Sequence, residues 1–199
     1  MAKGVNAEVE EGGFVLTPLQ QHALRRFAEQ GFAATKLAHI AADAGIKPPS
    51  IYAHFASKEE LFLSLLEPAV EHELFLTAQA LSGPGRSEKG LRAFLHGIGE
   101  RFYSTHHLRF LIQASYLPPG DLAAAIDSHI VPFYRRQTRI FRECFAAMPR
   151  GGLSAETLTV AYQGLRDSLQ TAVLYMGKEV FETRFKALWS VFSISLREK

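Results

Sequence analysis

Apolar residues recur at helical spacing through most of the chain, and this pattern limits the possible fold more than any other feature. In residues 154–176, Leu158, Tyr162 and Leu165 begin a run that continues in steps of three and four. The last segment repeats the pattern from Phe181 to Leu196. No segment shows the strict alternation that is typical of a half-buried strand. The sequence therefore predicts an all-α protein.

The composition favours a folded chain and restricts its function classes. Of the 199 residues, 47% are hydrophobic and 15 are Phe, more apolar material than a disordered chain carries. The formal net charge is only +2, so a surface that binds nucleic acid has to be local. The one cysteine, Cys144, excludes an internal disulfide and fits a reducing compartment. Because no secretory signal or membrane-spanning apolar run is visible, we expect a cytoplasmic protein with no membrane partner.

Cap residues and glycines divide the first third of the chain into short helices. Thr17, Pro18 and Gln20 resemble a capping box at the start of a helix, and Gly31 is placed to end it. Thr35 can cap a second helix, which we expect to end at Gly45.

Two consecutive prolines then interrupt the helical pattern and mark the start of a new helix. Pro49 disfavours helical geometry at Pro48 but suits the first position of a new helix. Ile51 and Phe55 can face inward together, which leaves the side chains between them facing away. A second capping box, Ser57 to Glu60, predicts one long helix to about Leu81 with a kink at Pro68.

Three short helices with a tight turn at Gly45 resemble a helix-turn-helix. In that motif the third helix places its N-terminal residues against base edges in the major groove, where side chains such as Ser50 and Tyr52 fit. The same spacing also fits a solvent-facing turn of an all-helical core. Spacing alone does not decide between the two.

One stretch of the chain, FAEQGFAATKLAHIAADAGIKPPSIYAHFASKEELF at residues 27–62, resembles the DNA-binding module of the tetracycline-repressor (TetR) family of bacterial transcription regulators. The resemblance extends from about Thr17 to Leu66. It implies a three-helix helix-turn-helix DNA-binding domain over 17–62 and a helical effector-binding and dimerisation domain over 63–199. The acidic, glycine-containing start of the chain predicts a flexible tail over residues 1–16. The matching residues, in order, are Phe27, Gly31, Thr35, Ile40, Ala41, Ala44, Gly45, Ser50, Tyr52, His54, Phe55 and Ser57 to Leu61.

The resemblance also implies which residues touch double-stranded DNA. Thr35 and Lys58 would hold phosphates from the two flanks, and Ser50 would lie against base edges. Hydroxyls and lysines outside the groove position a protein, whereas only groups inside the groove read sequence. The predicted DNA-binding residues are Thr35, Lys36, Lys47, Pro48, Pro49, Ser50, Tyr52, His54 and Lys58.

The module is weakly basic. Between Pro18 and Glu60 it carries five Lys and Arg residues against four Asp and Glu residues. About three to five phosphate contacts in each subunit predict a logarithmic salt slope of about 5 to 9 for a dimer.

An aromatic-rich section follows the linker at residues 82–88. Ligand pockets are typically apolar with a few convergent polar groups, and the family resemblance implies a small-molecule inducer of apolar or aromatic character here. An aromatic stripe at helical spacing is, however, more often ordinary core. The predicted ligand-binding residues are Phe102, Phe110, Gln113, Tyr116, Phe133, Tyr134, Gln137, Tyr162 and Arg166.

The two C-terminal apolar seams are the predicted homodimer surface. Helices near residues 156–175 and 179–196 of two subunits would form a four-helix interface, as in the family, and Gly164, Ser168 and Thr171 would allow close approach. The alternative is that both seams pack only within their own subunit.

These features predict a sequence-specific transcriptional regulator that needs no cofactor or metal. We expect a repressor, released from a palindromic operator by its inducer, because a dimer that covers a promoter needs no polymerase-contacting surface. An enzyme is one rival, but His96 with Glu100, the pair His106 and His107, and the Glu71 to Glu73 cluster have no diagnostic spacing. The other rival is a helical ligand-sensing or interaction module that has lost sequence-specific DNA binding.

Overall fold

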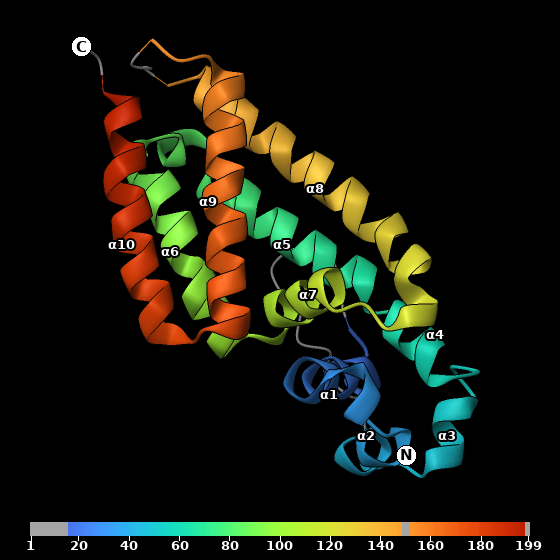
Figure 1. Ribbon diagram of the computed structural model, residues 1–199. Coiled ribbons are helices and arrows are strands. Elements are labelled where there is room, and N and C mark those ends of the chain that lie inside the picture. Colours follow the sequence, from blue (N-terminus) through green and yellow to red (C-terminus); the bar gives the residue numbers. More distant parts are fainter. Residues whose placement is uncertain (1–15, 149–151, 198–199) are drawn as a thin grey trace.

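The computed structural model describes residues 16–148 and 152–197, and every regular element in these ranges is a helix (Figure 1). The N-terminal helices α1 to α3 lie opposite the end formed by α6, α9 and α10, and α5 and α8 run side by side between them. Short 3-10 turns span Gly83–Gly85, Gly120–Leu122 and Ser193–Leu196. The α-helices are α1 (Pro18–Ala34), α2 (Leu37–Asp43), α3 (Pro48–Tyr52), α4 (Lys58–Leu63), α5 (Leu66–Ala80), α6 (Glu88–Ser104), α7 (His106–Tyr116), α8 (Ala123–Ala146), α9 (Ala155–Tyr175) and α10 (Lys178–Phe192).

The predicted all-helical class is confirmed, and the start of α1 follows its predicted cap. The Thr17 hydroxyl accepts a hydrogen bond from the Gln20 amide, and the Gln20 side chain accepts one from the Thr17 amide. Gly31 has a φ of 76° and interrupts the helical geometry, after which one further turn runs to Ala34. The predicted tail at 1–16 lies outside the described residues except for Leu16, which is buried in the core.

The predicted cap at Thr35 is wrong. The residue that precedes α2 is Lys36, whose side chain makes no capping hydrogen bond. The Thr35 hydroxyl instead lies 2.7 Å from the Gly31 carbonyl oxygen and 3.2 Å from that of Arg26. The hydroxyl thus donates to backbone carbonyls of α1 near Gly31, where the helical geometry is interrupted, and does not cap α2.

The predicted long helix from Ser57 to Leu81 is also wrong, because α4 ends at Leu63 and α5 begins at Leu66. Pro68 lacks an amide hydrogen and its ring crowds the carbonyl of Ser64, so the chain breaks one turn before the proline. Ser57 caps α4 by accepting from the Glu60 amide at 3.1 Å. The Glu60 carboxylate, however, accepts from Ala56 rather than completing the predicted box on Ser57.

Two apolar clusters form the core. The first joins α1 to α4 with α5, α7 and α8, so the predicted boundary at residue 62 crosses a continuous core. The second joins α6 and α8 with α9 and α10. The predicted dimer seam on α9 belongs to this second cluster, because Leu158, Tyr162 and Leu165 are buried within the subunit.

 Leu169 and Ala172 of the same seam are buried there too. Packing within the subunit, the alternative to the predicted interface, is therefore correct for this stripe.

None of the helices in the described part of the chain is both long and apolar enough to cross a membrane.

Tyr162 provides a test of the second cluster. Its fully buried hydroxyl donates to the Leu91 carbonyl oxygen at 2.7 Å and so joins α9 to α6. We expect Tyr162→Phe to lower the free energy of unfolding in urea by about 1 kcal/mol, because one buried hydrogen bond is lost. Tyr175→Phe on the exposed surface of the same helix is the control and should change it by less than about 0.5 kcal/mol. Equal effects of the two changes would contradict this role of the hydroxyl.

Candidate nucleic-acid interface

The short helix α3 presents most of the predicted DNA-binding residues to solvent. Ile51 is fully buried and anchors the helix on the first apolar cluster, whereas the Tyr52 side chain on the other face is 58% exposed. Because neighbouring residues of a helix point to different faces, burial of Ile51 leaves Tyr52 facing solvent. The exposed predicted residues on and beside α3 are Lys47, Pro48, Pro49, Ser50, Tyr52 and His54.

The two prolines change what the start of α3 offers to a ligand. Pro48 and Pro49 occupy its first two positions and carry no amide hydrogen. The next amide, that of Ser50, donates to the Lys47 carbonyl oxygen at 2.9 Å. This helix start therefore lacks the free amides that usually bind an anion, and it presents proline ring carbons and the Ser50 hydroxyl.

Lys58 and Thr35 lie together at the junction of α1, α2 and α4, as part of the internal structure. The Lys58 ammonium donates to the carbonyl oxygens of Phe32 (2.9 Å) and Thr35 (3.2 Å) and lies 4.1 Å from the centre of the Phe32 ring. An ammonium has three donors, so one remains for a phosphate. Thr35 is only 1% exposed, and this burial removes its predicted phosphate contact in this conformation. The neighbouring Lys36 is exposed.

An ion-pair cluster uses two of the five positive charges of the module. Both guanidinium groups of Arg25 and Arg26 hold the carboxylate of Asp43, with an Arg26 Nη2 to Asp43 Oδ1 distance of 2.7 Å and an Arg25 Nη2 to Asp43 Oδ2 distance of 3.0 Å. The hydrogen bonds from Arg26 lower the pKa of the Asp43 carboxyl far below its usual value. The cluster fastens α2 to α1 and leaves Lys36, Lys47 and part of Lys58 as the positive charges of the face.

The predicted ligand-binding residues fall into different surroundings. Phe110 and Phe133 belong to the first apolar cluster, and Phe102 and Tyr162 belong to the second. Tyr116 lies between helices with its hydroxyl 3.5 Å from Gln170 Oε1, and burial raises its pKa to about 12. The structure does not bring these residues to one cavity.

Gln137 and Arg166 are satisfied by each other and by their neighbours. The Arg166 guanidinium donates to Gln137 Oε1 at 2.5 Å and to Asp167 Oδ1 at 2.7 Å, and it lies 4.8 Å from the centre of the Tyr134 ring. Gln137 in turn donates to the Thr77 hydroxyl at 3.1 Å. This buried network joins α5, α8 and α9, and its hydrogen bonds satisfy both side chains without a ligand.

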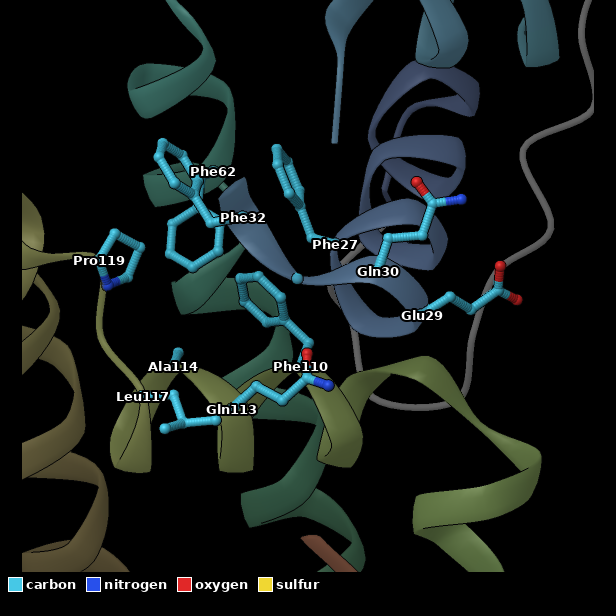
Figure 2. A pocket seen from close by; sticks show the side chains of 11 residues that line it. Phe27, Glu29, Gln30, Phe32, Phe62, Phe110, Gln113, Ala114, Leu117 and Pro119 are labelled. Atoms are coloured by element: carbon cyan, nitrogen blue, oxygen red, sulfur yellow. The ribbon is translucent and has the colours of Figure 1, made fainter. Parts of the chain in front are cut away.

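Two of the predicted residues, Phe110 and Gln113, line a cavity of about 270 Å³ (Figure 2). It lies between α7 and the reading module, which comprises helices α1 to α4. The opposite wall comes from Phe27 and Phe32 of α1 and from Phe62 of α4. Sequence reasoning missed these three as lining residues. Their helical spacing marks them as core, and no local signal shows that α7 lies opposite them.

Two of the groups considered for enzyme chemistry meet, because the rings of His72 and His107 stack with centres 4.2 Å apart. His96 lies 3.2 Å from Glu182 instead. Within residues 16–148 and 152–197, no group of three or more His, Cys, Asp or Glu side chains could hold a metal ion.

Comparison with known proteins gives a specific match for the reading module. Residues 21–65 match the family described as "Bacterial regulatory proteins, tetR family". The chain is 28% identical over 101 residues to the HTH-type transcriptional activator FasR of Mycolicibacterium smegmatis, covering 50% of this chain and 46% of that protein. It is 36% identical over 93 residues to the HTH-type transcriptional regulator AcrR of Shigella flexneri, covering 46% and 43%. The alignments thus span less than half of either relative.

The fold extends the likeness over most of the chain. The solved structure of AibR in complex with isovaleryl coenzyme A and operator DNA superposes with a TM-score of 0.63 at 13% identity, covering 87% of this chain and 95% of that one. At this identity, the likeness shows the fold alone.

Asp43 provides a test of the ion-pair cluster. A carboxyl whose pKa is lowered by folding stabilises the protein above its unfolded pKa of about 4, and this contribution is lost as the pH falls toward the folded value. We therefore expect Asp43→Asn to lower the thermal unfolding midpoint by a constant amount above about pH 5, with the difference shrinking below about pH 4.

The matched control is Asp127→Asn, at an exposed position on α8. It should change the midpoint little at any pH. A deficit of Asp43→Asn that stays constant down to about pH 2 would contradict the ion-pair explanation.

Proposed function

We propose that the chain is a sequence-specific DNA-binding transcriptional regulator of the tetR kind, because residues 21–65 match that family of bacterial regulatory proteins. The observation that carries the proposal is the exposed face of α3, whose residues lie within the segment that matches the family. In this proposal residues 17–62 read DNA, and residues 63–199 bind an effector and form a homodimer. No catalytic role is assigned to the chain.

The proposed DNA contacts divide into positioning and reading groups. Lys36, Lys47 and the remaining donor of Lys58 contact phosphates, which fix the position of the module on the duplex. Ser50, Tyr52 and His54 face the bases or the adjacent sugar-phosphate backbone. The ring carbons of Pro48 and Pro49 suit apolar contact with a thymine methyl group, because the helix start offers no amide donor there.

The proposed dimer surface is the outer face of α9 and α10, opposite the buried seam. Val160 of α9 is 60% exposed, Val191 of α10 is 71% exposed, and Ile194 of the 3-10 turn that follows α10 is 65% exposed. Gly164 lies on the same face, and an added Cβ there would meet no atom within 4 Å, so a second helix can approach closely. Exposed apolar stripes of this kind are typical of protein interfaces. A second copy of the chain would cover them and pair two reading modules for two half-sites.

A small molecule completes the proposal. AibR is a fold neighbour in complex with both isovaleryl coenzyme A and operator DNA, which supports an inducer-controlled regulator here. An inducer can release DNA only by binding more tightly to the state that does not fit the operator. We assign repression as the mode of action, since covering a promoter needs no contact with polymerase.

The second candidate is a ligand-sensing module that has lost DNA binding. The observation that favours it is the use of Arg25 and Arg26 by Asp43, which leaves the reading face with few free positive charges.

Selection of sheared genomic DNA from the source organism by the purified protein, at about physiological salt, separates the two candidates. We expect an imperfect palindrome whose half-sites lie about one helical turn apart, with a logarithmic salt slope of about 5 to 9. Lys47→Ala should reduce the slope by about 1 for each subunit, and Tyr52→Ala should weaken operator binding by about tenfold.

Lys89→Ala, on the exposed start of α6, is the matched charge control and should leave operator binding and the salt slope unchanged. A slope near zero, or uniform recovery of all fragments, would exclude sequence-specific binding by this chain alone and favour the second candidate.

The dimer surface has its own test. Val191→Arg places a charge on the proposed interface, so we expect a monomer in light scattering after size exclusion and a loss of operator binding by at least about hundredfold. Val131→Arg introduces the same charge on α8, away from this face, and should remain dimeric. A dimer that persists in Val191→Arg would place the interface elsewhere.

A further inference from the structure

The cavity of about 270 Å³ lies at the junction of two parts of the protein with different proposed roles. Phe27 and Phe32 at the end of α1 and Phe62 of α4 line it from the reading module, and Gln113 of α7 and Pro119 line it from the other side (Figure 2). Gly31, with its φ of 76°, also lies on the wall and marks the point where α1 stops being helical. A molecule in the cavity would therefore touch both parts at their junction.

The walls are aromatic. The Phe62 ring lies 5.1 Å from that of Phe27, 5.2 Å from that of Phe32 and 4.9 Å from that of Phe110, measured between ring centres. The rings meet edge to face or tilted, as aromatic pairs prefer. Phe27, Phe62 and Phe110 are almost fully buried, so Phe32, which is partly buried, is the most accessible ring of the wall. The volume is at the small end for ligand sites and limits an occupant to about one or two rings.

One polar atom stands out in this aromatic surround. Gln113 Oε1 is buried, and it accepts no hydrogen bond from any residue that the structure describes. A buried acceptor without a partner is costly, and a native protein usually satisfies it with water or a ligand. An occupant with one N–H or O–H donor would satisfy it. Leu117, at 57% exposure, lies at the edge of the cavity and leaves a way in from solvent.

The same wall is connected to the reading face. The Phe32 ring that lines the cavity has the Lys58 ammonium 4.1 Å from its centre, and the Phe32 carbonyl oxygen accepts from that ammonium at 2.9 Å. Lys58 also donates to the carbonyl oxygen of Thr35, two residues before α2. A molecule that moves Phe32 would thus move Lys58, one of the proposed phosphate contacts, and the start of α2.

We propose that this cavity binds a small planar aromatic molecule with one N–H or O–H donor, and that its occupation weakens DNA binding through Phe32 and Lys58. The regulatory half rests on the proposed function, whereas the binding half does not.

Calorimetry on the DNA-free protein tests the binding half. The probes are indole, which has one N–H, and benzothiophene, a ring system of the same shape without a donor. We expect saturable binding of one indole per chain, about tenfold tighter than benzothiophene, because only indole can donate to Gln113. Gln113→Leu should remove this preference, and Leu117→Trp, which fills the entrance, should weaken both probes.

The matched control is Gln79→Leu, an exposed position on α5 outside the cavity, which should bind both probes as the unchanged protein does. Absence of saturable indole binding would overturn the proposal. Equal binding of both probes, or binding that Leu117→Trp leaves unchanged, would also overturn it.

Operator titration with and without saturating indole tests the regulatory half. We expect indole to weaken binding by about fivefold in the unchanged protein and in Gln79→Leu, within the usual range of coupling between sites, and to have no effect in Leu117→Trp. Indole binding without any change in operator affinity would overturn the link through Phe32. Failure of the protein to bind DNA at all, with indole still bound, would instead refute the proposed function and leave the site standing.

Discussion

The contact between Phe62 and Phe110 is the interaction on which the arrangement of this protein depends. The two rings, 4.9 Å apart, join α4 of the reading module to α7 of the larger helical part. Phe27 and Phe32 complete the cluster, so α1, α4 and α7 share one apolar core. Burial of aromatic side chains is a large source of stability, and their close packing leaves few alternative orientations. The direction of α3 relative to the rest of the chain follows from this junction.

Charge within the reading module serves its internal structure as well as its surface. The Asp43 carboxylate pairs with two arginines, and two of the three N–H groups of the Lys58 ammonium donate to backbone carbonyls. These contacts fasten α2 and α4 to α1, which a module with helices of only five to seven residues needs, because such short helices are not stable alone. The consequence is a face with few free positive charges, so DNA recognition by this chain would depend on close base contacts and on pairing of two modules.

Local signals predicted the helix starts and turns well. Thr17 and Ser57 cap their helices, and Gly31 and Gly45 have the positive φ angles that their positions required. Thr35 failed as a cap because its hydroxyl donates to the Arg26 and Gly31 carbonyls instead, a contact that depends on how α1 ends. The candidate ligand residues dispersed for a related reason: helical spacing shows that Phe102, Phe133 and Tyr162 are buried, but not which helix lies opposite each one.

The helical class, most helix boundaries and the exposed residues of α3 can be predicted from the amino-acid pattern, because all of these depend on spacing and on contacts between residues close in the chain. Three features became visible only in the folded chain: the α9 seam faces inward, Arg25 and Arg26 meet Asp43, and an aromatic cavity lies beside Gln113. Each of these features joins residues from helices that are separate in sequence. Their meeting depends on how the helices pack, which short-range patterns do not specify.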